Sequence, residues 1–442
     1  MGVRLQRKNE DYEMTLLKRF LTQSKNIEKS GVFWNMVASM LVAFQSVILL
    51  MVMNRTVGLV AAGIYTMGNT DCNLFLSIGK YGTRFFQVSD VKREYKFREY
   101  RMARIISTIA MAVISTAYVL FIANKNGYSS NKTMIIIWMC LFKLPDAFED
   151  VYYGDYQKNE RLDVASKAMG LRMIITIILW AVLLVVTRSL LLSVIVSTIV
   201  TTLLMILFLC LTKEYVTERE SYNMGRVWKL LLVTLPLCIG AFLTLYIGAA
   251  PRNAIDEHLN DELQAIYGFI AMPVFVVQLL VLFIFNPMLY GISCLWNENK
   301  LRKYIMECLK QVMYVIAITV VCLAGAWLLG IPVLSAMYGV DLSPYKYDLL
   351  IMMLGSGLLG FAGLLANLLT VMRYQNAILG GYIAVSVIAF FFSDKAVVEH
   401  GIRGAVLIYL VLLLILSMIF LAEYLYGIFR RRDQLRKANA AQ

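Results

Sequence analysis

The number of long apolar runs constrains this chain more than any other feature. A helix that crosses a bilayer needs about 20 mainly apolar residues. The 442-residue chain is 60% hydrophobic and only 16% charged, well outside the usual range for soluble domains. Twelve stretches qualify as spans, at 33–54, 57–82, 103–124, 133–153, 170–187, 190–212, 228–250, 264–287, 312–331, 349–372, 377–393 and 404–428. The sequence therefore predicts an all-α polytopic membrane protein with about 12 transmembrane helices.

The distribution of basic residues predicts the orientation of these spans. With both termini in the cytoplasm, 32 Lys and Arg residues fall in inner segments and eight fall in outer ones. Such an excess is the positive-inside signal of membrane proteins. Topology and attraction to anionic membrane lipids therefore account for the net charge of +13, and no nucleic-acid partner is needed.

A charged inner loop after the sixth span divides the chain into two halves of six spans. Short stretches recur near the outer end of the second span of each half, as Ala-Gly-Ile-Tyr at 62–65 and Ala-Ile-Tyr-Gly at 265–268. Two halves of equal orientation imply a pseudo-twofold axis along the membrane normal. The predicted parts are a cytosolic basic N-terminal segment (1–30), an N-terminal six-helix bundle (31–213), a cytosolic linker (214–227), a C-terminal six-helix bundle (228–429) and a basic cytosolic tail (430–442).

The cysteines and histidines do not indicate a metal site or a catalytic site. The seven cysteines lie almost entirely within apolar runs and lack paired spacing, which is typical of small core residues. The only two histidines, His258 and His400, fall in predicted outer loops. We therefore expect no metal site, no catalytic residues and no bound cofactor.

A polar stripe follows the second span. At steps of three and four, a helix would bring to one face Thr66, Asn69, Asn73, Ser77, Lys80 and Arg84. Such a face avoids lipid and turns to protein or to a water-filled cavity. Asp71 lies near the centre of the same span but points away from the stripe. Asn69, Asn73, Lys80 and Arg84 are therefore candidate pathway residues.

The fourth span is unusually acidic. It carries Lys143, Asp146, Glu149 and Asp150, and Pro145 can bend the helix there. Lys143 can pair with Asp146 along its own helix, so one interpretation is a structural ion pair near the inner interface. The other is a functional site, because ionisable groups within spans usually serve transport.

Three stretches resemble a known family. They are 79–90 (GKYGTRFFQVSD), 251–256 (PRNAID) and 265–269 (AIYGF). They are similar to bacterial polysaccharide-biosynthesis membrane proteins, which are oligosaccharide flippases of the multidrug/oligosaccharidyl-lipid/polysaccharide (MOP) exporter superfamily. The resemblance implies two six-helix bundles around a central cavity, in a bacterial plasma membrane. By alternating access, such a protein moves a polyprenyl-pyrophosphate-linked oligosaccharide from the inner to the outer leaflet.

The resemblance also assigns roles to the polar residues. A pyrophosphate cannot cross hydrocarbon unpaired and requires cations in a hydrated groove. Lys80 and Arg84 would capture it at the inner mouth, and Arg55 and Arg252 would receive it near the outer mouth. Asp71, Asp146, Glu149 and Asp150 are candidates for H⁺ or Na⁺ coupling. The implied partners are the lipid-linked oligosaccharide, membrane lipids and other polysaccharide-assembly proteins.

Two other classes of function compete with the flippase. A cation-coupled multidrug antiporter of the same fold would have carboxylates and little cationic lining, which Lys80 and Arg84 disfavour. A membrane polysaccharide polymerase or glycosyltransferase would usually have a large outer loop, whereas the longest outer loops here, near 250–263 and 331–348, are short. We therefore expect a transporter, not an enzyme.

Overall fold

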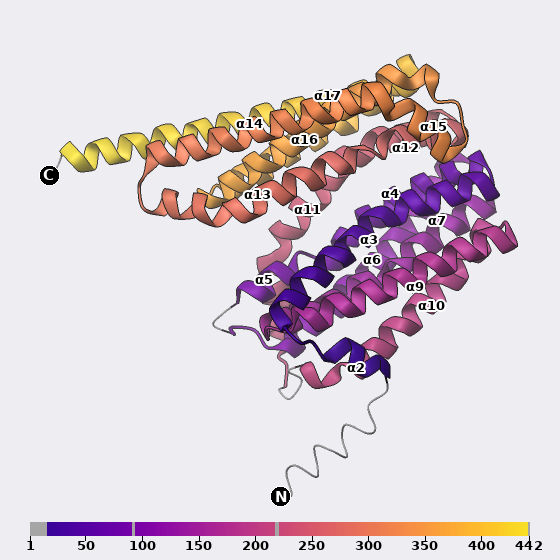
Figure 1. The fold of residues 1–442 in the computed structure, drawn as a ribbon, viewed down its shortest axis with the longest axis horizontal. Coiled ribbons are helices and arrows are strands. Elements are labelled where there is room, and N and C mark those ends of the chain that lie inside the picture. Colours follow the sequence, from indigo (N-terminus) through magenta and orange to yellow (C-terminus); the bar gives the residue numbers. More distant parts are fainter. Residues whose placement is uncertain (1–15, 91–92, 217–220, 441–442) are drawn as a thin grey trace, which may run out of the picture. The chain divides into compact units, whose positions relative to one another are not determined.

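The protein is built from helices. The computed structural model describes residues 16–90, 93–216 and 221–440, and these residues form no β-strand. The predicted all-α class is thereby confirmed. The chain folds into two compact units, whose helices are labelled in Figure 1: unit 1 is the chain up to Val57 with Asp71–Cys238, and unit 2 is Gly58–Thr70 with Ile239–Gln442. Two helices, α4 and α11, therefore contribute to both units.

In unit 1, α3 packs along α9, α10 packs against α7 and α9, and α5 and α6 pack against α8. Side-chain caps begin several of its helices: Asn26 accepts a hydrogen bond from the Lys29 amide at α3, and Ser189 accepts one from the Leu192 amide at α10. The helices of this unit are α2 (Leu16–Thr22), α3 (Ile27–Thr56), the second part of α4 (Leu59–Lys80), α5 (Thr83–Ser89), α6 (Phe97–Asn126), α7 (Ser130–Phe142), α8 (Leu144–Lys158), α9 (Leu162–Thr187), α10 (Leu190–Leu211), η1 (Lys213–Tyr215) and the first part of α11 (Met224–His258).

In unit 2, α16 packs along α17 and also against α13 and α14. The longest helix, α17, contains a break at Gly401, where φ is 59° and ψ is −137°. It therefore holds two predicted spans, at 377–393 and 404–428. Besides parts of α4 and α11, this unit contains α12 (Asp261–Ala271), α13 (Val274–Asn297), α14 (Leu301–Gly325), η2 (Ala326–Gly330), α15 (Ile331–Tyr338), η3 (Ser343–Tyr345), α16 (Lys346–Val371) and α17 (Gln375–Ala440).

All twelve predicted spans coincide with helical structure. Nine helical segments of the described chain are long and apolar enough to cross a membrane, and one of them, Gln375–Lys437, contains two predicted spans. The two predicted spans outside this set are α4 and the pair α7–α8. These are the spans with the polar stripe and the acidic residues, so the segments that fit a lipid environment least are those with the most polar chemistry.

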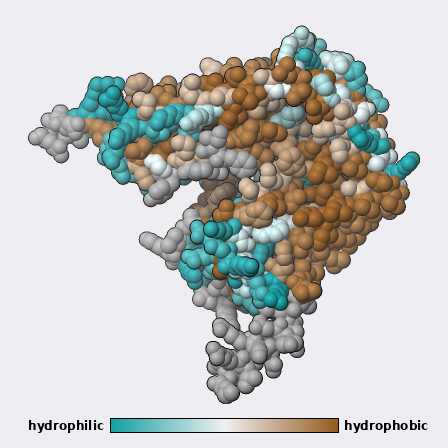
Figure 2. Space-filling model, viewed as in Figure 1, coloured by the Kyte–Doolittle hydropathy of each residue, from teal (hydrophilic) through white to brown (hydrophobic). Residues whose placement is uncertain are grey.

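The surface follows the same pattern. Figure 2 shows hydrophobic residues over the middle of the helices and hydrophilic residues at their ends. Large apolar side chains are strongly exposed on several helices, among them Val186, Val321 and Leu328, which are 74%, 70% and 70% exposed. Exposure of this kind suits a lipid surface and would be a liability in water. The protein is thus a multi-pass membrane protein.

One expectation about the polar stripe is wrong. Helix α4 ends at Lys80, and the backbone of Tyr81 and Gly82 is left-handed, with φ of 52° and 65°. Arg84 therefore lies on a separate short helix, α5, and not on the stripe. Gly82 explains the break, because glycine adopts this conformation at little cost. The Gly79 carbonyl, left without a helical donor, accepts hydrogen bonds from Arg104 and Ser107 at 2.8 Å each.

The acidic span is also interrupted. Helix α7 ends at Phe142, and α8 begins at Leu144 with Pro145 in its first turn. Proline has no amide hydrogen and is well tolerated there. The bend predicted from Pro145 takes the form of a break at Lys143, which puts the acidic residues at the start of a new helix.

Two glycines offer a test of the break after α4. Gly82 and Gly127 have nearly the same backbone, with φ of 65° and 64°, but an added Cβ would lie 2.8 Å from Leu237 Cβ at Gly82 and would contact nothing at Gly127. The left-handed backbone alone costs a non-glycine residue about 1–2 kcal/mol. We expect Gly82→Ala to lower the melting temperature in detergent more than Gly127→Ala does. Equal melting temperatures for the two variants would contradict this packing.

Candidate functional site

The charged side chains of unit 1 gather around α8. Three of its four acidic residues, Asp146, Glu149 and Asp150, occupy two turns and are nearly buried, and basic residues from α5, α6 and α9 approach them. A carboxylate removed from water costs several kcal/mol unless a cation and hydrogen bonds compensate it. The partners of these carboxylates therefore determine what the site can do.

Asp150 is shared by two arginines. Arg104 is fully buried and donates to Asp150 Oδ2 at 2.8 Å, as well as to Thr83 Oγ1 at 2.7 Å. Arg84 donates to Asp150 Oδ1 at 3.3 Å and to Gln157 Oε1 at 3.1 Å. The two guanidinium groups differ in access, because the Arg84 side chain is 29% exposed and that of Arg104 is not exposed. Arg84 can thus reach a ligand while Arg104 holds the carboxylate.

Asp146 and Glu149 share a third arginine. Arg172, on α9, is 1% exposed and contacts both carboxylates, and it also donates to Thr201 Oγ1 at 2.7 Å. Lys143 adds an ion pair with Asp146 at 3.3 Å. The pairing of Lys143 with Asp146 along one segment agrees with its interpretation as a structural pair. Three of the four candidate ion-coupling carboxylates are therefore bound to basic side chains in this conformation.

Lys80 differs from these cations. It is half-buried at the C-terminal end of α4, and it forms no ion pair within 4.0 Å among the residues that the structure describes. Its charge acts on Asp146 from a greater distance. The negative end of the helix dipole favours a cation at this position. Lys80 and Arg84 therefore provide positive charge that unit 1 does not fully neutralise.

The structure places the remaining predicted residues on α3 and α4. Asp71 is 2% exposed and Asn73 is half-buried on the part of α4 that belongs to unit 1. Arg55 is exposed in the last turn of α3. Asn69 lies on the part of α4 that belongs to unit 2. The roles predicted for these four residues stay predictions.

Unit 2 holds a single predicted substrate cation, Arg252. This half-buried residue of α11 donates to Thr70 Oγ1 at 2.9 Å, and its guanidinium lies 5.7 Å from the centre of the Tyr267 ring. Within the described part of the chain, no carboxylate lies within 4.0 Å of it. A guanidinium held by a hydroxyl and an aromatic face keeps its full charge for an anion.

The sequence prediction missed Arg104 and Arg172. Both were counted with the inner basic residues because they lie at the beginning of the spans predicted at 103–124 and 170–187, yet they are among the largest fully buried side chains. A signal was present: three carboxylates in one span need more positive charge than Lys143 provides. Arg104 and Arg172, near the beginning of two other predicted spans, could have supplied this positive charge.

Asp90, the residue after α5, accepts several hydrogen bonds. Its carboxylate accepts hydrogen bonds from the amides of Glu94 and Tyr95, at 2.8 and 3.1 Å, and from the hydroxyl of Tyr100 at 3.1 Å. Partial burial raises the pKa of Asp90, but these hydrogen bonds and the charge of Lys158 outweigh it, so the pKa lies below its usual range. The ionised form is therefore bound more strongly in the folded protein.

One group of side chains has the chemistry of a metal site. The ligand atoms of Glu257, His258 and Asp394 lie within 4.8 Å of one another in unit 2. His258 Nε2 is 3.7 Å from Asp394 Oδ1, and both side chains are open to solvent. Exposed clusters of this kind often hold no ion, and the expectation of no metal site stays a prediction.

Comparison with known proteins defines the fold. No protein-family model and no curated protein matches the sequence. Among solved structures, the chain is similar to an inward-facing multidrug resistance MATE family transporter of the MOP superfamily, with a TM-score of 0.65 and 12% identity over 91% of this chain and 99% of that one. An outward-facing transporter of the same description gives a TM-score of 0.59 and 15% identity, over 96% and 100% of the two chains.

A third similar solved structure is that of a transporter from Pyrococcus furiosus. It is a MOP superfamily transporter described by the reverse polarity of its binding pocket and by a different suggested function. Its TM-score is 0.59 with 15% identity, over 95% of this chain and 99% of that one. The chain therefore has the two-lobe helical fold of MOP superfamily transporters, while identities this low leave the substrate open.

Replacing Arg104 tests the shared ion pair. Arg104→Met removes one of the two cations on a nearly buried carboxylate, and breaking a buried pair typically costs about 3–5 kcal/mol. We expect a large drop in melting temperature in detergent. Lys229→Met is the control, because Lys229 is exposed and forms no ion pair with a described residue. Similar melting temperatures for both variants would show that Arg104 is not essential to packing.

The pKa of Asp90 predicts a pH dependence of stability. A carboxyl group whose pKa is lowered on folding stabilises the fold above its unfolded-state pKa of about 3.9, and the effect is lost as the pH falls through the folded-state value. We expect Asp90→Asn to melt at a lower temperature than the wild type at pH 7. The gap should close as the pH falls below about 4. If the difference in melting temperature between Asp90→Asn and the wild type were the same at pH 7 and below pH 4, the charge of Asp90 would not contribute to stability.

Proposed function

We propose that the protein is a membrane transporter that moves a polyprenyl-pyrophosphate-linked oligosaccharide from the inner to the outer leaflet by alternating access. The observation that carries this proposal is the accessible positive charge at Lys80 and Arg84. A pyrophosphate headgroup needs such charge before it leaves water. Membrane lipids and other polysaccharide-assembly proteins are the partners that this function implies, in a bacterial plasma membrane with both termini in the cytoplasm.

The chemistry of Arg84 suits reversible capture of an anion. Its bond to Asp150 is the longer of the two arginine contacts, at 3.3 Å against 2.8 Å for Arg104. Arg84 can release the carboxylate to bind a phosphate with its planar fork, and Asp150 then keeps Arg104 as its partner. No carboxylate is left uncompensated, so binding does not carry the penalty of an isolated buried charge.

Arg252 supports the same ligand chemistry in unit 2. No carboxylate neutralises it among the described residues, and Thr70 and Tyr267 orient it. It would receive or release the headgroup, and the exposed Arg55 would act near the outer mouth. Asn69 and Asn73 would provide amide hydrogen bonds along the route.

The solved structures support the transport class. Transporters of this fold are known in inward-facing and outward-facing conformations, as alternating access requires. The Pyrococcus furiosus transporter indicates that the polarity of the binding pocket varies within the fold. A cationic site in this chain would be a further case of such variation.

A cation-coupled multidrug antiporter is the second candidate. It is favoured by the carboxylates of α8 and by the multidrug transporters among the structural relatives. A cationic drug, however, needs a carboxylate that is available, and Asp146, Glu149 and Asp150 are bound to arginine or lysine. A flippase would use the accessible positive charges of Lys80 and Arg84, so we prefer the flippase to the antiporter.

Complementation distinguishes the two functions. We expect the wild-type gene to restore surface polysaccharide in a flippase-deficient strain and Arg84→Ala to reduce it about tenfold or more, since one charge-assisted hydrogen bond contributes about 1.5–3 kcal/mol. Lys80→Ala should act in the same direction. The control Lys229→Ala removes an exposed cation and should complement fully. Full complementation by Arg84→Ala at normal protein levels would refute the assignment.

Neutralising Asp71 tests the coupling ion. Asp146, Glu149 and Asp150 are bound to arginine or lysine, so replacing any of them would disturb an ion pair as well as any coupling. If Asp71 couples transport to H⁺ or Na⁺, Asp71→Asn should reduce transport driven by an ion gradient at equal amounts of folded protein, because an amide neither takes up a proton nor carries a negative charge. Transport by Asp71→Asn that still responds fully to the gradient would exclude Asp71 as the coupling group.

A further inference from the structure

Unit 2 contains a cationic cavity that the proposed transport route does not use. Its volume is about 320 Å³, and the residues of its lining that bear on ligand binding are Trp296, Asn297, Arg373, Tyr374, Arg430 and Arg431. No carboxylate lines it within the described part of the chain. We call it the arginine pocket. Pockets of a few hundred cubic ångströms are the usual size of small-ligand sites.

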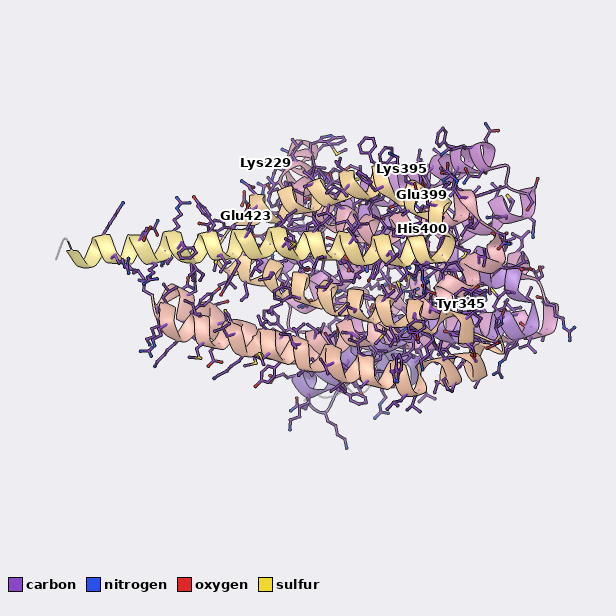
Figure 3. All side chains as sticks on the ribbon, turned by 90° about the horizontal axis from the view of Figure 1, so that it is seen from above. Lys229, Tyr345, Lys395, Glu399, His400 and Glu423 are labelled. Atoms are coloured by element: carbon purple, nitrogen blue, oxygen red, sulfur yellow. The ribbon has the colours of Figure 1, made fainter. Side chains whose placement is uncertain are left out.

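Three helices of unit 2 bring these residues together. Helix α13 ends at Asn297, helix α16 ends at Val371, and the last third of α17 supplies Arg430 and Arg431. Both α13 and α17 pack against α16. In Figure 3, the part of α17 that follows Glu423 continues toward the C-terminus, away from the end where Lys395, Glu399 and His400 lie. The basic residues predict that this side of the protein faces the cytoplasm.

The walls of the pocket are organised for recognition. Arg431 lies over the Trp296 ring, 5.4 Å from its centre, and donates to Asn299 Oδ1 at 2.6 Å. Its Nε is buried without a hydrogen-bond partner. A guanidinium that is fixed by an aromatic face can donate to a further acceptor through those of its N–H groups that are open to the cavity.

Arg373 occupies a backbone position that normally belongs to glycine. Its φ is 66°, in the turn that closes α16, where the amide of Tyr374 bonds to the Leu369 carbonyl at 2.9 Å. Glycine is preferred at such helix ends, and another residue there costs about 1 kcal/mol. Arg373 in this conformation lines the pocket and adds a positive charge to it.

The nearby acidic residues do not neutralise the pocket. Glu298 follows the lining residue Asn297 but pairs with Lys300 at 2.7 Å. Asp433 is exposed and does not line the cavity. The C-terminal ends of α13 and α16 attract some positive charge, but such an end needs only one nearby cation, worth about 0.3–1 kcal/mol. Three arginines around one cavity exceed that need.

We propose that the arginine pocket binds a phosphate group. Arginine binds phosphate oxygens through two parallel hydrogen bonds, and the aromatic rings of Trp296 and Tyr374 suit the interface between headgroups and water. The phosphate belongs either to an anionic phospholipid headgroup or to a soluble phosphate compound. The pocket is independent of Lys80 and Arg84, so its ligand need not be the transported molecule.

The test uses the purified full-length protein in detergent and native mass spectrometry. The probes are sodium pyrophosphate, phosphatidylglycerol and, as the neutral-headgroup reference, phosphatidylcholine. The pocket variant is Arg373→Gln/Arg431→Gln. Its matched control is Arg432→Gln/Arg436→Gln, which removes the same charge from exposed positions of α17 that do not line the cavity.

All variants are made in a Lys80→Ala/Arg84→Ala background, which removes the proposed transport site. We expect the pocket variant to bind one of the two anionic probes about tenfold or more weakly than this background protein does, and the control to stay within about twofold. Loss of pyrophosphate binding identifies a soluble phosphate ligand, and loss of phosphatidylglycerol binding alone identifies a lipid headgroup. Equal binding of both probes by the pocket variant and its control would overturn the proposal.

A second variant guards against a folding defect. Arg373→Lys/Arg431→Lys keeps the charge but removes the planar fork, so it should fold like the background protein and bind the probe with intermediate affinity. If this variant and the glutamine variant both lower the melting temperature while the affinity of the folded fraction is unchanged, the arginines serve only to stabilise the helix ends. That result would also overturn the proposal.

Discussion

The sharing of one carboxylate by two arginines organises the functional part of unit 1. Asp150 is held by Arg104 from within the protein and by Arg84 from its more accessible side. The same Arg104 bonds to the carbonyl of Gly79, at the point where α4 ends. The ion pair therefore joins the break between α4 and α5 to the acidic helix α8. It leaves Arg84 able to exchange a carboxylate for a ligand, because Arg104 stays in place.

This arrangement explains why charge can persist in a protein made mostly of apolar helices. Each carboxylate on the acidic face of α8 has a basic partner, so none is buried alone. In the cluster around α8, the charged side chain with the greatest access to solvent is that of Arg84. Lys80 has no ion pair within 4.0 Å among the described residues, and Arg252 rests on a hydroxyl and an aromatic ring in unit 2. In the proposed function, the carboxylates of α8 stabilise the fold and the accessible cations bind the anionic headgroup.

Most of the fold could be predicted from the sequence, because hydrophobicity alone determines where a chain can cross a bilayer. The arrangement of the candidate site was harder to predict from the sequence. The stripe from Thr66 to Lys80 is helical as expected, but the helix ends at the left-handed Tyr81 and Gly82, and Arg104, which is distant in sequence, binds the carbonyl that this break leaves free. Arg172 was counted with the inner basic residues because hydrophobicity does not locate the end of a span to within a few residues. Ion pairs between helices depend on tertiary packing, and no local sequence pattern shows which helices pack together.

The central claim is that this fold carries an anionic lipid headgroup, and flipping in reconstituted vesicles measures it most directly. A fluorescent polyprenyl-pyrophosphate disaccharide is placed in both leaflets, and an impermeant quencher is added outside. We predict that vesicles with the wild-type protein lose their inner-leaflet signal over time, whereas vesicles with the Lys80→Ala/Arg84→Ala protein and empty vesicles retain it. Retention of that signal by the wild-type protein, together with transport of a cationic drug by the same vesicles, would contradict the account.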